Sequence, residues 1–198
     1  MYKIITKNSI VRYVDPEIID ENGVWKNSIF DPNVTTLNSE IFYSEYLPKY
    51  FRVKKWTYKN KKFMILPEYE KQIIDDVKKD AIEKIDNDTS QKILSGFSYE
   101  IDNEIFHFSY DMYDQQNFSD CANMILSGNN ISSIYVNAYK DSEVTQFEFE
   151  NDQFMDLYIN GALKHKMQTI EDGKTRKAEI MNMEHLDDIE IKLTEWNL

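Results

Sequence analysis

The sequence predicts an α+β fold in which a β-rich N-terminal module is followed by helices packed with small antiparallel hairpins. Residues 1–66 hold short segments of alternating apolar residues between turn residues, a pattern typical of strands. Residues 68–95 are strong helix formers, and Pro67 before them with Gly96 after them marks the two ends of a helix. Beyond Gly96 the sequence alternates between hairpin patterns and amphipathic helix patterns, as expected for small antiparallel sheets combined with helices.

Two hairpins are predicted in the N-terminal part of the chain. The first joins residues 3–6 to residues 9–14 through Lys7-Asn8, and the second joins 52–58 to 62–66 through residues 59–61. Residues 20–48 contain scattered aromatic residues and Asn-rich turns, and no long element is predicted there. We therefore expect residues 1–66 to form a β-rich attachment module.

From residue 97 onward the predicted elements follow one another closely. In chain order they are a hairpin at 97–110, a helix at 112–127 capped by Asp111, a hairpin at 134–149, a helix from Asn151 to about Thr169, and a short helical piece at 178–183. Residues 171–177 are polar and contain Gly173, which predicts a loose loop. Alternating apolar residues at 189–193 predict an edge strand. Residues 67–198 are thus predicted to form one α+β module.

The charge of the chain is large and unevenly spread. The 198 residues carry a formal net charge of −12. Residues 1–70 hold 11 Lys and Arg against 9 Asp and Glu, whereas residues 71–198 hold 12 against 26. Because phosphate binding needs a cationic surface, the acidic bulk argues against nucleic acid as the main partner. The step in charge also favours two modules with different tasks.

The residue patterns that accompany catalysis are missing from the sequence. The five glycines form no phosphate-binding loop, and the three histidines lack metal-ligand spacing. Cys121 is either a nucleophile or a small buried apolar residue, and its place between Phe118 and Ile125 on a helix favours the second interpretation. We therefore predict a protein that is not an enzyme and that uses no cofactor and no metal.

No apolar run is long enough for a membrane span or a signal peptide, since the longest contains four residues. We therefore expect no membrane partner and synthesis in the cytoplasm.

A basic and aromatic tract at residues 49–63 allows three interpretations. Trp56 and Tyr58 could stack on the bases of single-stranded nucleic acid. The tract could instead dock an acidic partner, including another copy of this chain. The third interpretation is a hairpin with one buried aromatic face and one solvated lysine face. The candidate partner-binding residues are Tyr50, Phe51, Arg52, Trp56 and Tyr58, and the candidate interface anchors also include Phe42, Tyr43 and Tyr46.

Residues 68 to about 184 carry an ordered set of parts. A charged helix with an isoleucine stripe leads into Gly96-Phe97, and a short hairpin follows that ends in Tyr110. The next helix opens with an Asp-Gln-x-Asn sequence, and a second hairpin then precedes another helix. This order resembles a domain of unknown function that recurs in phage and prophage tail-fibre and fibre-assembly proteins. The chain departs from the usual pattern because its first helix is not rich in Ala, and the resemblance does not cover residues 1–66.

The resemblance implies a structural component of a bacteriophage or phage-like tail, associated with the baseplate or tail fibre and acting through protein–protein contacts. It implies other tail proteins as partners, a homo-oligomer such as a trimer, and a place in the tail of the virion. Two alternatives stay open: a tail-fibre assembly chaperone and a nucleic-acid-binding regulatory protein.

The residues of the signature are expected to be structural. They are Gly96, Phe97, Asp114, Gln115 and Asn117. Asp114 lies near a helix start, where its carboxylate can accept backbone N–H bonds, and Gln115 and Asn117 can bind the neighbouring hairpin backbone. A direct role in binding a partner or an ion is the alternative.

Overall fold

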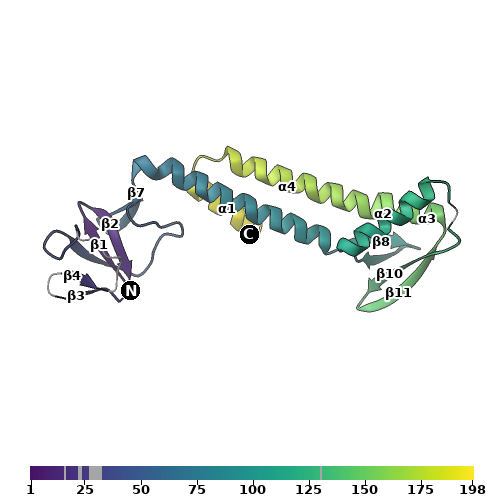
Figure 1. Ribbon diagram of the computed structural model, residues 1–198, viewed down its shortest axis with the longest axis horizontal. Helices are drawn as coiled ribbons and strands as arrows, with labels where there is room; N and C mark the ends of the chain where they lie inside the picture. The colour runs from purple at the N-terminus through teal and green to yellow at the C-terminus, as the bar shows by residue number, and fades with distance from the viewer. Residues whose placement is uncertain (16, 22–23, 27–32, 130) are drawn as a thin grey trace. The chain divides into compact units, whose positions relative to one another are not determined.

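The computed structural model describes residues 1–15, 17–21, 24–26, 33–129 and 131–198 (Figure 1). It confirms the predicted α+β class, with a β-rich N-terminal half followed by helices and small antiparallel sheets. The chain forms two compact units, Met1–Val77 and Lys78–Leu198, and the division falls inside helix α1 (Pro67–Leu94). The expected boundary between attachment module and α+β module at Pro67 coincides with the start of this helix.

The N-terminal unit contains a five-stranded antiparallel sheet with strand order β5-β1-β2-β6-β7 and a two-stranded ribbon, β3-β4. The strands are β1 (Tyr2–Lys7), β2 (Ile10–Asp15), β3 (Ile19–Glu21), β4 (Val24–Lys26), β5 (Glu40–Ser44), β6 (Trp56–Lys59) and β7 (Lys62–Ile65). Both predicted hairpins are present, as β1–β2 and β6–β7. β6 begins at Trp56 rather than at residue 52, and the first turn lies at Asn8-Ser9 because Lys7 still belongs to β1. Residues 20–48 hold only short strands, and residues 22–23 and 27–32 of that stretch lie outside the described residues.

Both faces of this N-terminal sheet are covered by apolar side chains. The adjacent residues Ile4 and Ile5 of β1 are both fully buried, and neighbouring residues of a strand point to opposite faces. Ile5 belongs to one buried cluster with Tyr13, and Ile4 belongs to a second with Val11 and Tyr58. Both faces are therefore covered at the centre of the sheet, whereas the outer strands β5 and β7 carry exposed residues such as Tyr43 and Met64.

The C-terminal unit contains a four-stranded antiparallel sheet with strand order β11-β10-β9-β8. Its strands are β8 (Phe97–Ile101), β9 (Glu104–Phe108), β10 (Ile134–Lys140) and β11 (Glu143–Phe149). Helix α2 (Met112–Leu126) lies between β9 and β10 in the chain, and α3 (Asn151–Asp156) follows β11. One face of the sheet packs on these helices in a core rich in phenylalanine, which includes Phe97, Phe106, Phe108, Phe118, Phe149 and Phe154.

The third predicted helix is longer than expected, and its predicted end and the loop after it are wrong. A continuous helical run passes from α3 through a π-helical segment, η1 (Leu157–Leu163), into α4 (Lys164–Asn182), with Glu150 rather than Asn151 at the N-cap position. Gly173 lies inside α4 at a point where α1 comes close. A Cβ added to it would lie 2.5 Å from Thr89 Oγ1 of α1. The glycine thus marks a tight helix–helix contact rather than a turn.

The predicted edge strand at residues 189–193 is also wrong, because this segment is part of helix α5 (Leu186–Glu195). Ile189 and Leu193 are buried, whereas Ile191 between them is 57% exposed. Burial therefore follows the four-residue spacing of a helix face, although the alternation of apolar residues also fits a strand.

Helices α1 and α4 run side by side and antiparallel within the C-terminal unit (Figure 1). The carbonyl oxygen of Lys92 lies 3.1 Å from His165 Nε2, and Asp88 lies 2.7 Å from Arg176 Nη1. Farther along, Lys78 Nζ donates to the carbonyl oxygen of Met181. These contacts pair later residues of α4 with earlier residues of α1.

Candidate functional site

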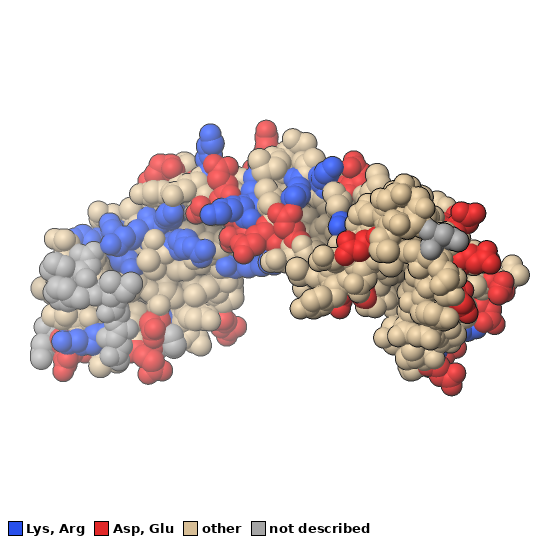
Figure 2. All heavy atoms as spheres, turned by 45° about the vertical axis from the view of Figure 1, so that its right-hand side comes forward, with Lys and Arg blue, Asp and Glu red and all other residues tan. Residues whose placement is uncertain are grey.

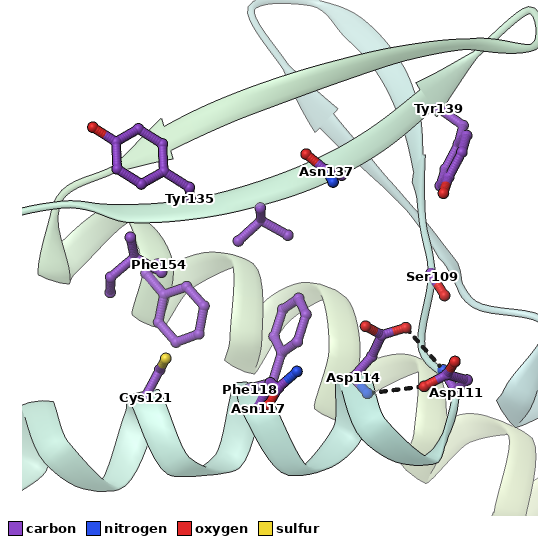
Figure 3. A pocket seen from close by; sticks show the side chains of 12 residues that line it. Ser109, Asp111, Asp114, Asn117, Phe118, Cys121, Tyr135, Asn137, Tyr139 and Phe154 are labelled. Carbon is purple, nitrogen blue, oxygen red and sulfur yellow. Dashed lines mark hydrogen bonds between the residues drawn. The ribbon is translucent and has the colours of Figure 1, made fainter.

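A groove lies between α2 and β10 of the C-terminal unit, with a cavity of about 350 Å³ (Figure 3). Apolar side chains line its interior, and they are Phe118, Cys121, Ile134, Val136 and Phe154. Polar and aromatic side chains complete the lining, and they are Ser109, Asp111, Asp114, Asn117, Tyr135, Asn137 and Tyr139. An apolar interior with a few convergent polar groups is the usual composition of a binding site.

The acidic end of the groove is built by the start of α2. Asp111 is the N-cap, as the sequence predicts, and its Oδ1 accepts hydrogen bonds from the backbone N–H groups of Tyr113 and Asp114 at 2.8 and 2.9 Å. Asp114 Oδ2 in turn accepts from the backbone N–H of Asp111 at 3.2 Å. This reciprocal capping box satisfies donors that a helix start leaves free, and it fixes two carboxylates beside each other (Figure 3).

Gly96 and Phe97 do not line the groove, and they position strand β8 of the sheet. Gly96 has a φ of +95°, and an added Cβ would lie 2.1 Å from the carbonyl oxygen of Phe108. Only glycine tolerates both conditions. Phe97 is buried, its ring stacks on that of Phe108 with a centroid distance of 5.4 Å, and the space beside it is filled by the backbone of Gly161.

Gln115 and Asn117 have separate roles although they are neighbours in the signature. Gln115 Nε2 donates to the carbonyl oxygen of Tyr110 at 3.1 Å, which binds the backbone after the hairpin as expected. Its Oε1 accepts from Lys166 Nζ at 2.8 Å, so this side chain also connects α2 to α4. Asn117 is exposed and lines the groove together with Asp114. The structure therefore brings two of the five signature residues to the candidate site.

One edge of β10 is open where it borders the groove. β10 pairs with β11 along its full length, from Ile134 to Lys140. Its pairing with β9 comprises only Ala138 with Phe108 and Tyr139 with His107. Among the described residues, positions 134–137 therefore have no strand partner on the side that faces away from β11.

The electrostatics of the groove favour a cation and give no support to a reactive thiol. Two carboxylates line the cavity, and its lining includes no Lys or Arg. Burial, together with the nearby charge of Asp120, raises the pKa of the Cys121 thiol. A raised pKa disfavours the thiolate, which is the nucleophilic form. This side chain thus behaves as part of the apolar lining.

The basic and aromatic tract of the N-terminal unit does not present all of its rings to solvent. Trp56 and Tyr58 are buried, Tyr50 and Phe51 are half-buried, and Arg52 is exposed. The ring of Tyr58 packs on that of Phe63 with a centroid distance of 4.6 Å. This arrangement favours the interpretation of a hairpin with a buried aromatic face, and Figure 2 shows Lys and Arg side chains gathered on the surface of this unit.

Within the described ranges, no group of three or more His, Cys, Asp or Glu side chains is arranged to hold a metal ion. None of the helices there is long and apolar enough to cross a membrane. Comparisons with protein families, with curated proteins and with solved structures find no match to this chain.

The contribution of β10 to the site is not among the residues predicted from the sequence. Tyr135, Asn137 and Tyr139 alternate with the inward-facing Ile134, Val136 and Ala138, so the alternation itself could have marked these tyrosines as outward-facing. The open edge has no comparable signal, because the sequence does not show where the pairing of two strands stops.

Proposed function

We propose that this chain is a structural, non-enzymatic component of a bacteriophage or phage-like tail, associated with the baseplate or tail fibre. It acts through contacts with other tail proteins and with copies of itself in a homo-oligomer such as a trimer. It is made in the host cytoplasm and resides in the tail of the virion. The resemblance of residues 68 to about 184 to tail-fibre-associated domains supports the setting, and an exposed apolar sheet face supports the mode of action.

The exposed apolar face is the observation that carries the proposal. The four-stranded sheet packs one face on its helices, and the other face carries Ile105, Tyr135, Tyr139 and Val144, which are between 42% and 65% exposed. Tyr139 is directly paired with Val144 on one side and with His107 on the other, so these side chains adjoin across strands. Exposed apolar residues that adjoin in this way, as Tyr139 and Val144 do, are typical of protein contact surfaces.

The direct test is the composition of purified particles. Particles from the host that carries the gene should contain the chain in a fixed number of copies, and electron microscopy of particles lacking it should show a missing or misassembled tail part. A chain that is needed for fibre assembly but absent from mature particles would instead be a chaperone. Particles of normal composition and shape without it would refute both.

A pair of substitutions on β11 tests whether the apolar face makes the contacts. Val144→Lys introduces a charge on this face, whereas Thr145→Lys introduces the same charge at the next exposed residue, which points to the other side of the strand. We expect incorporation into particles to fall at least about tenfold for Val144→Lys and to stay near wild type for Thr145→Lys. Equal incorporation of the two variants would remove this face from the proposal.

A further inference from the structure

We infer that the groove between α2 and β10 binds an extended segment of a partner protein, which adds a strand to the open edge of β10. The segment carries apolar side chains that enter the cavity and a basic side chain that reaches Asp111 and Asp114. Three features of the groove lead to this inference: the free strand edge, the apolar cavity beside it, and the charge at one end.

The free edge supplies the backbone contacts. Positions 134–137 are held in strand conformation by β11, yet β9 ends at Phe108 and leaves their other side without a strand in the described part of the chain. Four residues of strand span about 13 Å, which is enough for a short extended segment. A strand edge exposes a row of N–H and C=O groups, and peptide segments bind such edges by completing the ladder.

The cavity supplies pockets for alternate side chains. In a strand added to β10, every second side chain points toward α2, into the cavity that Phe118 and Cys121 of α2 and Val136 of β10 line. Two side chains on the same face of a strand are separated by one residue, so two apolar side chains of the segment can enter the cavity from the same face. This is the feature that would select the sequence of the partner, because the backbone contacts are common to all peptides.

The charge at the acidic end selects a cation. The hydrogen bonds of the capping box use Oδ1 of Asp111 and Oδ2 of Asp114, so the second oxygen of each carboxylate takes part in none of them. Both carboxylates line the cavity, and no basic residue is among the lining residues. A lysine or arginine of the partner can therefore pair with them, whereas an acidic segment would be repelled.

This inference deepens the proposed contact function and rests on it, but the two can fail separately. The peptide test uses the isolated full chain in solution, whereas the particle test measures incorporation into tails. Absence of peptide binding with normal incorporation into particles would reject only the peptide-binding groove. Peptide binding by a chain that is absent from particles would reject only the assignment to the tail.

The probe is an acetylated and amidated heptapeptide, Lys-Thr-Val-Thr-Val-Thr-Lys, whose Lys and Val side chains share one face of an extended strand. Lysine at both ends lets the peptide bind in either direction. We expect saturable binding to the full chain, observed by amide chemical-shift changes that concentrate in β10 and the start of α2. The matched peptide with Glu in place of both Lys should bind at least about tenfold more weakly.

Two N-methylated peptides test the added strand itself. Successive N–H groups of a strand point to opposite sides, so only one set faces the edge of β10. One peptide is methylated at both Val nitrogens, and the other at the two outer Thr nitrogens. Only one of the two should therefore lose binding. Equal binding by both would overturn the strand-addition geometry.

Matched charge variants on α2 locate the site without changing the core. Asn117 and Gln116 are adjacent and exposed, and only Asn117 lines the groove. We expect Asn117→Lys to weaken binding of the lysine peptide at least about tenfold and Gln116→Lys to leave it unchanged. Absence of binding up to millimolar peptide, preference for the glutamate peptide, or equal effects of the two substitutions would overturn the inference.

Discussion

Gly173 is the residue that allows α4 to approach α1. A Cβ on it would lie 2.5 Å from Thr89 Oγ1 and 3.4 Å from Thr89 Cβ. We therefore expect Gly173→Ala to destabilise the protein by about 1–2 kcal/mol, because the overpacked contact outweighs the gain in helix propensity. Urea unfolding followed by circular dichroism gives this free energy of unfolding.

The companion variant Thr89→Ala shows whether the clash is the cause. With the threonine hydroxyl and methyl removed, the nearest remaining atom is the Cβ of residue 89, at an ordinary contact distance. Gly173→Ala in this background should stabilise the protein by about 0.5–1 kcal/mol through helix propensity alone. Destabilisation of similar size in both backgrounds would mean that the glycine serves another purpose.

Arg176 joins three helices at a buried point. Its guanidinium lies 2.7 Å from Asp88 of α1, 3.0 Å from Asp172 of α4, and 5.9 Å from the ring centroid of Trp196 just after α5. The Arg176 side chain is 6% exposed, but Asp88 and Asp172 are 21% and 57% exposed, so solvent reduces the energy of the pairs. We expect Arg176→Ala to lower the free energy of unfolding by about 2 kcal/mol.

The control for Arg176 is Lys174→Ala in the same helix. Lys174 pairs with Glu171, and both side chains are mostly exposed. This substitution should change the unfolding free energy by less than about 0.5 kcal/mol. If thermal and urea unfolding give equal losses for the two variants, the buried junction has no special role.

Asp88 makes the free energy of unfolding depend on pH in the acidic range. Burial alone would raise the pKa of Asp88, but hydrogen bonds and charges from Lys92 and Arg176 hold it below its ordinary value. The ionised carboxylate therefore contributes stability above the unfolded-state pKa of about 4, and this contribution is lost as the pH falls through the lower folded-state pKa. Unfolding measured from pH 5 to pH 2 should show a flatter profile for Asp88→Asn, and an unchanged profile would contradict the assignment.

At the scale of elements, four hairpins turn through the same unusual backbone conformation. The central pairs Asn8-Ser9, Asn60-Lys61, Asp102-Asn103 and Asp141-Ser142 all have positive φ at both residues. This is the geometry of type I′ turns, whose twist matches that of the strands and in which glycine is favoured at the second position. In this conformation most residues other than Gly, Asn and Asp lose about 1 kcal/mol of stability.

Glycine at one of these turns should stabilise its hairpin. Ser142 has a φ of +70°, and we expect Ser142→Gly to raise the unfolding free energy by about 0.5–1 kcal/mol. The matched variant Ser98→Gly lies within β8 of the same sheet, where greater backbone freedom should lower stability by about 0.5–1 kcal/mol. Changes of the same sign in the two variants would argue against the turn as the cause.

The elements that could be predicted are those whose ends carry local signals. The hairpins have turn residues between apolar segments, α1 has Pro67 and Gly96, and α2 has its Asp111 cap. The predictions at α4 and α5 were wrong because tertiary packing decided the structure there. Gly173 is typical of a helix end, and the alternating apolar residues around Ile191 are typical of a strand, but both segments are helical. Part of the candidate site could be predicted for the same reason. The capping residues of α2 are recognised from their immediate sequence, whereas the open edge of β10 depends on where its pairing with β9 stops.

At the scale of the whole molecule, charge and burial both argue against nucleic acid as the partner. The net charge is −12, and Trp56 and Tyr58, the rings best placed in the sequence to stack on bases, are buried. In titrations of single-stranded DNA at 50 and 200 mM salt, we expect a dissociation constant weaker than about 100 µM at the lower salt and no measurable binding at the higher. Sub-micromolar binding that weakens steeply with salt would show that the exposed lysines of residues 49–63 act as a phosphate-binding surface.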